Sequence, residues 1–151
     1  MAEPSPIDAG EFDADSVAAI IYTPDGDYVM QLRDDLPAVT FRGMLGLFGG
    51  SRDPGEDFEA ALRRELREEL CADPAQVREF MVMTFDRRMA GGRYARRRFY
   101  MAEASREEIA HYKLGEGAAI ELMSFREIVA KAGAIIPYDF CAISLHAQDL
   151  G

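Results

Sequence analysis

The segment GGSRDPGEDFEAALRRELREEL, residues 49–70, constrains the fold most strongly, because a glycine pair leads directly into an acidic amphipathic helix. At about 100° per residue, four apolar side chains fall along one stripe of this helix, and the stripe must face a core. They are Phe58, Leu62, Leu66 and Leu70. Glu65 and Glu69 border the same stripe, and Glu68 lies on their flank. The helix therefore carries three carboxylates at the edge of the hydrophobic core.

Carboxylates crowded beside a core repel one another and lose hydration, which costs several kcal/mol unless a positive group lies among them. A divalent cation is the simplest such group. The alternative is a solvated helix with Glu and Arg paired four residues apart, each pair worth about 0.3–0.5 kcal/mol. The position of the acids along the apolar stripe, and the glycine loop that precedes the helix, favour the cation.

The spacing of the fixed residues in this segment resembles the signature of the Nudix hydrolases. That signature has a glycine, five residues, a glutamate, seven residues, and then Arg-Glu-apolar-any-Glu-Glu-any-Gly-apolar. This chain has Gly50, Glu56 and then RELREELCA at residues 64–72. Cys71 stands where the signature has a glycine, at a cap where a left-handed backbone favours glycine, so the form of this cap is left open.

The resemblance implies a fold, a metal site and a reaction. The fold is an α/β/α sandwich with a mixed central sheet and a loop-helix-loop that carries the signature. The implied ligands of Mg²⁺ or Mn²⁺ are Glu65, Glu68, Glu69 and the backbone carbonyl of Gly50. Arg64 and Glu56 are implied to form an ion pair that fastens the loop to the helix. The reaction is attack of water at phosphorus, which cleaves the pyrophosphate linkage of a nucleoside diphosphate linked to another group.

Such a reaction requires a general base within reach of the attacking water, directly or through one other water. Glu65 and Glu68 on the helix are candidates. Glu116 in the segment LGEGAAIE is a third, because Gly115 and Gly117 allow that segment to approach the metal site closely. The alternative for Glu116 is an exposed turn residue.

An arginine-rich segment, DRRMAGGRYARRR at residues 86–98, stands out in an acidic chain. In a strand, Tyr94, Arg96 and Arg98 share one face, which suits stacking on a base and binding of phosphates. The alternative is an edge hairpin that charge keeps soluble and unpaired. Arg33, at the end of the first predicted hairpin, is a further candidate for phosphate contact.

The two cysteines and the two histidines are expected to have structural rather than functional roles. Cys71 and Cys141 are isolated cysteines without a metal-binding spacing, and we expect free, buried thiols. His111 and His146 are expected on the surfaces of helices.

The order of the predicted elements indicates a single α/β domain. Residues 1–14 are acidic and proline-rich and predict a disordered tail, and residues 15–151 predict one Nudix-like domain. Capping boxes predict helices that begin after Ser105 and Ser124, and Pro137 predicts the first turn of a last helix. The expected strands cover residues 16–23, 28–33, 44–48, 78–86, 93–104 and 118–123.

The formal net charge of −10 opposes binding along a nucleic acid duplex, whose phosphates repel an acidic protein. The chain has no apolar run of membrane-spanning length, and MAEPSPIDAGEFDAD at its start lacks the features of an export signal. We therefore expect a cytoplasmic protein without a membrane partner. The expected partner is a small nucleotide, and the arginine-rich hairpin leaves a homodimer open.

Two functions from different classes are open. The first is a divalent-metal-dependent pyrophosphohydrolase that acts on a nucleoside triphosphate or a related nucleotide, since the chain is close to the size of a minimal domain. The second is a catalytically silent Nudix-like module that binds a nucleotide or a partner protein. The intact set of three glutamates favours the enzyme.

Overall fold

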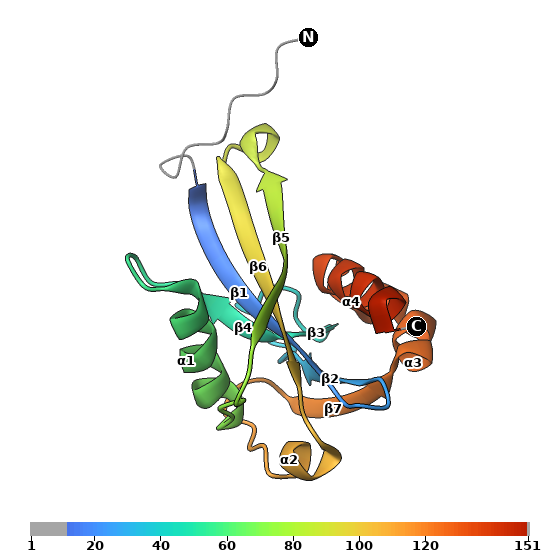
Figure 1. Ribbon diagram of the computed structural model, residues 1–151. Coiled ribbons are helices and arrows are strands. Elements are labelled where there is room, and N and C mark those ends of the chain that lie inside the picture. Colours follow the sequence, from blue (N-terminus) through green and yellow to red (C-terminus); the bar gives the residue numbers. More distant parts are fainter. Residues whose placement is uncertain (1–11, 151) are drawn as a thin grey trace.

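A mixed sheet with helices on both faces makes up the protein, and the computed structural model describes residues 12–150 of it (Figure 1). The strands are β1 (Phe12–Tyr22), β2 (Asp27–Leu32), β3 (Leu45–Gly46), β4 (Phe48–Ser51), β5 (Arg78–Asp86), β6 (Tyr94–Glu103) and β7 (Ala119–Ser124). The α-helices are α1 (Phe58–Leu70), α2 (Arg106–Ala110), α3 (Phe125–Ala130) and α4 (Pro137–Leu150). Two short 3₁₀ turns, η2 (Arg88–Ala90) and η3 (Ala132–Ala134), complete the described elements.

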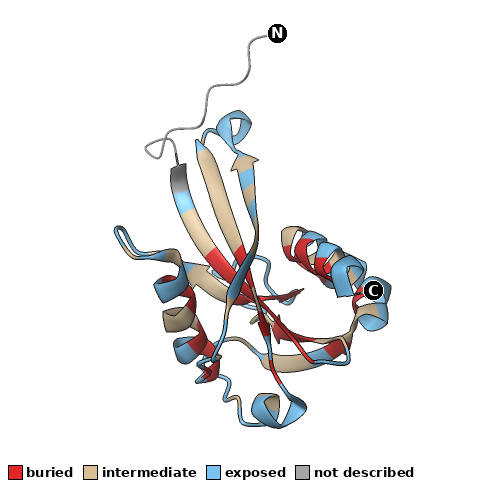
Figure 2. Ribbon diagram, in the orientation of Figure 1, coloured by how far each residue is buried: buried red, intermediate tan, exposed pale blue. Residues whose placement is uncertain are grey.

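Strand β1 lies at the centre of the sheet and is buried on both faces. Val17, Ala19 and Ile21 belong to the apolar cluster that packs against α1, whereas Ala18 and Ile20 belong to the cluster that packs against α4. This alternation follows from the two-residue period of a strand, and a strand covered on both faces reads as a continuous apolar run. Figure 2 shows the buried residues gathered where the strands cross and on the inner faces of α1 and α4. The predicted sandwich is confirmed.

The order of the strands places the glycine pair against the central strand. Strand β1 runs parallel to β6 and antiparallel to β2 and β4, with Gly49 opposite Ala18 and Gly50 opposite Val17. The backbone at Gly49 has φ +153°, and a Cβ there would lie 2.1 Å from the carbonyl oxygen of Val17. Only glycine permits this close approach of β4 to β1. The loop that follows is thereby fixed beside the helix α1.

Most of the predicted elements occur where the sequence placed them. The hairpin turns of β1–β2 and β5–β6 are present, and both capping boxes form, at Ser105 and at Ser124. The expected tail lies outside the described residues up to residue 11, and β1 begins at Phe12. Among the described residues, no helix is long and apolar enough to cross a membrane.

The prediction that His146 lies on a helix surface is wrong, because this side chain is 2% exposed. Its Nδ1 is hydrogen-bonded to the hydroxyl of Tyr28 at 3.0 Å, and its ring lies 4.5 Å from the ring of Tyr22 and 5.4 Å from that of Phe80. Burial lowers the pKa of His146, opposed by the charge of Asp149. The imidazole therefore lies within an aromatic cluster under α4, in surroundings that favour its neutral form.

This burial predicts a loss of stability in mild acid. Below about pH 6.5 the unfolded chain binds a proton at His146 more readily than the folded chain does, so the free energy of unfolding falls as the pH drops through that value. Replacing both partners with the apolar pair Tyr28→Phe and His146→Phe removes the titrating group without leaving a buried polar atom unpaired. Thermal midpoints measured from about pH 7.5 to about pH 5.5 should fall more steeply for the unmodified protein. Parallel curves for the two proteins would contradict this account.

Candidate active site

Arg64, in the middle of α1, fastens this helix to the loop that precedes it. Its Nε and Nη2 donate to the two carboxylate oxygens of Glu56 at 2.9 and 3.0 Å, and Nη2 also donates to the carbonyl of Ser51 at 3.0 Å. Asp57 caps the helix by accepting the N–H of Ala60. Residues 51–56 are therefore held against the helix, and Arg64 and Glu56 meet as the signature implies.

Two of the helix carboxylates face the glycine pair. Glu69 is 3% exposed, and its Oε2 accepts the N–H of Gly49 at 2.9 Å. Glu65 lies against Gly50, where a Cβ would stand 2.5–2.7 Å from the carboxylate of Glu65. Any side chain at residue 50 would therefore displace the acid. The glycine pair and the carboxylates of Glu65 and Glu69 therefore lie in contact, and this acidic cluster is called the acidic pocket below.

Burial makes these carboxylates unfavourable as anions. Desolvation raises the pKa of Glu69 to about 8, with further contributions from the charges of Glu116 and Glu65, while the hydrogen bond from Gly49 lowers it. Desolvation also raises the pKa of Glu65, against the lowering effect of Arg64. A cation in the pocket would favour the ionised form of both groups.

The guanidinium of Arg64 lies beside the carboxylates of Glu65 and Glu68. Its Nη1 donates to Oε1 of Glu65 at 2.8 Å and lies 3.5 Å from Oε2 of Glu68, whose side chain is 59% exposed. In the described part of the chain, no three His, Cys, Asp or Glu side chains are arranged around a common point as metal ligands. The donors nevertheless fit Mg²⁺ or Mn²⁺, because both ions prefer carboxylate and carbonyl oxygens and the bare Gly50 leaves the carboxylate room.

The helix ends in a left-handed cap despite its cysteine. Cys71 has φ 52° and ψ 32°, and its N–H donates to the carbonyl of Arg67 at 3.1 Å. A non-glycine residue in this conformation costs about 1–2 kcal/mol, which the packing of α1 on the sheet offsets. Cys71 and Cys141 are free but exposed, so the expectation of buried thiols is wrong.

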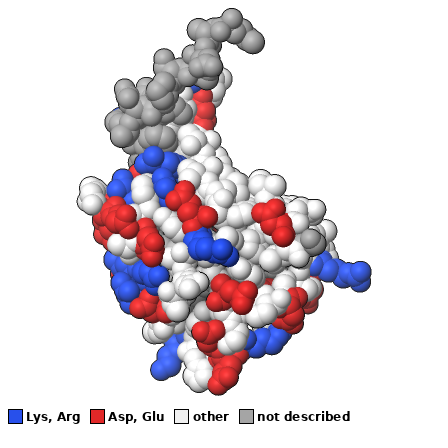
Figure 3. Space-filling view, viewed as in Figure 1, with Lys and Arg blue, Asp and Glu red and all other residues white. Residues whose placement is uncertain are grey.

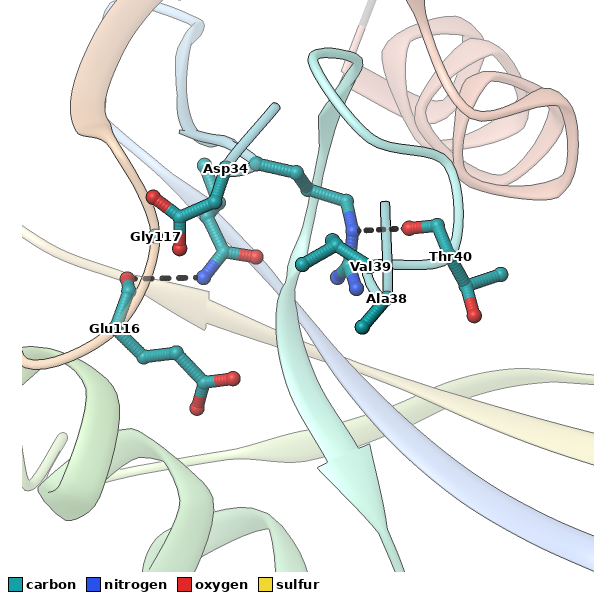
Figure 4. Close-up of a pocket in the computed structure, with 8 residues that line it drawn as sticks. Asp34, Ala38, Val39, Thr40, Glu116 and Gly117 are labelled. Carbon is teal, nitrogen blue, oxygen red and sulfur yellow. Dashed lines mark hydrogen bonds between the residues drawn. The ribbon is translucent and has the colours of Figure 1, made fainter. Parts of the chain in front are cut away.

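Glu116 extends from a loop that docks on the end of α1. The N–H of Gly115 donates to the carbonyl of Glu69 at 2.7 Å, and Nε2 of Gln31 donates to the carbonyl of Glu116 at 3.1 Å. Figure 4 shows the Glu116 carboxylate pointing from this loop toward α1. Its charge acts on Glu65 and Glu69, so the structure places Glu116 beside the acidic pocket.

Arg96 and Arg98 share one face of β6, as predicted, and this face meets the start of α1. Their guanidinium groups lie 5.1 and 4.1 Å from the ring centre of Phe58, and they form ion pairs with Asp15 and Glu79. Such contacts tie the helix to the sheet. Figure 3 shows acidic and basic side chains interspersed over the face that carries α1 and β5.

Tyr94, the third member of the predicted face, lies 5.0 Å from the guanidinium of Arg88. Arg33 instead borders the acidic pocket, where its Nε donates to the carbonyl of Thr40 at 2.7 Å. Arg33 therefore lines a cavity together with Gly49 and Gly50.

Three cavities that share lining residues extend from Glu116 past the glycine pair to a cluster of aromatic rings, and together they are called the groove below. A cavity of about 240 Å³ is bordered by Glu116 and Arg33, and the next, of about 190 Å³, by Arg33, Gly50 and Tyr138. A third cavity of about 450 Å³ shares Tyr138 with the second. Its lining includes Phe41, Phe85, Arg97 and Tyr138. The groove therefore joins an acidic end to an aromatic end.

Arg97, Tyr138, Phe41 and Phe85 were not singled out by their sequence context. Arg97 points to the opposite face from Arg96, donates from Nε to the buried Asp139 at 3.1 Å, and lies 5.0 Å from the ring centre of Tyr138. The Tyr138 ring stands 5.7 Å from that of Phe41. Strand alternation predicts that Arg97 lies on the face of β6 opposite to Arg96. The contacts of that face with α4 and with Phe41 depend on the tertiary structure.

Comparisons with known proteins agree with this arrangement. The NUDIX domain family model matches residues 13–142. The MutT protein of Methanosarcina mazei Go1 has a TM-score of 0.73 at 18% identity, covering 90% of this chain and 94% of that one. The NUDIX domain of Shewanella oneidensis NrtR complexed with ADP ribose has a TM-score of 0.74 at 19% identity, with coverages of 96% and 94%.

A third similar structure is the E. coli dihydroneopterin triphosphate pyrophosphohydrolase, with a TM-score of 0.69 at 19% identity and coverages of 89% and 95%. At these identities the structural likenesses establish the fold. No curated protein matches the sequence.

The raised pKa of Glu69 predicts that the acid destabilises the metal-free protein. A carboxyl whose pKa is raised on folding stabilises the fold below about pH 4.5, and this stabilisation is lost as the pH rises through about 8. Glu69→Gln keeps an acceptor for Gly49 and should raise the free energy of unfolding at neutral pH by on the order of 2 kcal/mol. Denaturant unfolding with a chelator present measures this difference. Glu59→Gln, on the exposed side of the same helix, is the control, and a destabilised Glu69→Gln protein would refute the assignment.

Proposed function

The chain belongs to the NUDIX family, and from this premise we propose that it is a pyrophosphohydrolase that cleaves a nucleoside triphosphate or a related nucleotide with the help of Mg²⁺ or Mn²⁺. The observation that carries the proposal is the carboxylate of Glu69, buried against Gly49 where the groove passes the glycine pair. A binding module without chemistry has no need for an ionisable group held at this cost.

The metal ligands of the proposal are Glu65, Glu68, Glu69 and the carbonyl of Gly50. Arg64 pairs with Glu65 and Glu68 in the structure, so a positive charge already orients these acids. A bound ion would take over this contact. A bound divalent ion would neutralise charge on the phosphates and lower the pKa of water. Arg64 keeps its second role, because its bonds to Glu56 and Ser51 come from Nε and Nη2, whereas Nη1 faces Glu65 and Glu68.

The general base of the proposal is Glu116. Glu65 and Glu68 are the alternatives, but both are needed as ligands, and a carboxylate bound to a cation is a weak proton acceptor. Glu116 comes from a separate loop and points toward α1 (Figure 4). This position supports Glu116 as the acceptor of the proton of a water that attacks phosphorus from the loop side of the pocket.

The substrate of the proposal spans the groove. Its phosphates lie at the acidic end, where Arg33 provides a guanidinium group for phosphate oxygens. Its base enters the aromatic cavity beside Tyr138, Phe41 and Phe85. The similar structures named for dihydroneopterin triphosphate and solved with ADP ribose involve ligands that likewise combine a ring system with a phosphate chain. A small domain with a groove of this kind suits a nucleoside triphosphate.

We predict metal-dependent turnover of at least one compound in a panel of nucleoside triphosphates, nucleotide sugars and dinucleotides. Products identified by mass spectrometry after reaction in ¹⁸O-labelled water should show a cleaved pyrophosphate linkage with the label on one phosphate. Glu69→Gln should lower kcat by at least about a hundredfold, since it removes charge from the pocket in which charge develops. Glu59→Gln should retain activity.

A catalytically silent binding module, the alternative function, predicts a different result with the same panel of compounds. A catalytically silent module predicts a raised thermal midpoint with one of the compounds and no product at any metal concentration. That combination across the whole panel would contradict the proposed hydrolase.

The aromatic cavity predicts a binding role for Tyr138. Loss of a base-stacking ring costs about 1–3 kcal/mol, so Tyr138→Ala should raise KM by roughly tenfold or more with a smaller change in kcat. Tyr138→Phe preserves the ring and should leave KM within about twofold. Steady-state kinetics on the best substrate of the panel measures both parameters. An unchanged KM in Tyr138→Ala would place the base elsewhere.

A further inference from the structure

The loop that carries Glu116 is bonded on one side to the last turn of α1. The N–H groups of Lys113 and Gly115 donate to the carbonyls of Leu70 and Glu69 at 2.9 and 2.7 Å. A Cβ on Gly115 would lie 2.1 Å from the carbonyl oxygen of Glu68, so the loop backbone touches the helix. The same turn of α1 carries two proposed metal ligands. The loop and these acids therefore share one rigid support.

On its other side the loop is bonded to β2. Nε2 of Gln31 donates to the carbonyl of Glu116 at 3.1 Å, and the N–H of Ala118 donates to the carbonyl of Leu32 at 2.8 Å. Gly117 has φ +97°, and a Cβ there would lie 3.0 Å from Cγ and Nε2 of Gln31. Figure 4 shows the amide of the β2 side chain meeting the backbone of residue 116. The amide therefore packs on and bonds to the loop at the base of the Glu116 side chain.

The chemistry of Gln31 calls for this bond. Gln31 is 3% exposed, and its neighbours Val29 and Met30 on β2 are fully buried apolar residues. Burying an amide costs free energy unless it is hydrogen-bonded, and Gln31 meets this requirement at the wall of the cavity that it shares with Glu116. The bond to Glu116 explains why a polar group lies here. It fixes the backbone from which the Glu116 carboxylate projects.

We propose that Gln31 is a positioning residue for the reaction, which sets the location of Glu116 relative to the acidic pocket on α1. This inference rests on the proposed function of Glu116 as the base. Two anchors, the α1 turn and Gln31, hold the loop from opposite sides, and Gly115 and Gly117 allow both contacts to be close. A displacement of about 1 Å at a reacting group is enough to cost about a hundredfold in rate.

A double-mutant cycle tests the coupling between the two residues. Gln31→Met keeps the length of the side chain but removes the donor, and it should lower kcat by roughly ten- to a hundredfold with KM within about threefold. In a Glu116→Gln background the same change should have less than about a twofold effect, since the group it positions is gone. Met30→Leu, the buried neighbour on β2, is the matched control and should leave kcat within about twofold. An equal loss of kcat in both backgrounds, or no loss in either, would overturn the proposal.

Amide hydrogen exchange gives a readout that does not depend on turnover. Gln31→Met should accelerate exchange of the amides of Gly115 and Ala118, whereas Met30→Leu should leave their protection unchanged. If the unmodified protein turns over no compound, the proposed function fails, and exchange alone then decides whether Gln31 holds the loop. Unchanged protection of both amides in Gln31→Met would overturn the positioning role. Gln31→Leu serves in the same experiments if Gln31→Met does not fold.

Discussion

Glu69 brings a buried carboxylate into contact with the backbone of Gly49, at the place where β4 lies against the central strand β1. Three constraints meet there. The close approach of the two strands requires glycine, the apolar stripe of α1 requires burial against the sheet, and the N–H of Gly49 donates a hydrogen bond to the acid. Packing of α1 on the sheet therefore buries the carboxylate of Glu69. The electrostatic character of the pocket is therefore built into the packing of the fold.

The groove combines two environments because different faces of the molecule supply its ends. Its acidic end is lined by Glu116 and Asp34, and the loop that carries Glu116 is bonded to the last turn of α1. Its aromatic end is made by α4, β5 and β6, where Asp139 accepts from both Arg97 and the N–H of Leu47. Because Leu47 is close to the glycine pair, the buried carboxylate of Asp139 also connects the glycine pair to the aromatic end of the groove. A nucleotide has the same division between a ring system and a charged chain.

Local signals predicted the elements well. The alternation in β1, the turn glycines and the capping boxes at Ser105 and Ser124 act over a few residues, so the sequence contains all that is needed to locate them. The helix carboxylates were predicted for the same reason, since one helix holds them. By contrast, the burial of His146 and the aromatic end of the groove depend on how α4 docks on the sheet. The sequence indicated only that Gln31 lies in a strand, because its hydrogen-bond partner Glu116 is 85 positions away. The left-handed Cys71 shows that tertiary packing overrides a local preference.

The account depends on a cation that compensates the buried acids. The most direct test is calorimetric titration of Mn²⁺ or Mg²⁺ into chelator-treated protein, with the thermal midpoint followed in parallel. Saturable binding with a rise in the thermal midpoint is expected for the unmodified chain, and neither is expected for Glu69→Gln. Absence of both heat and stabilisation at millimolar concentrations of either ion, in a folded protein, would contradict the central claim.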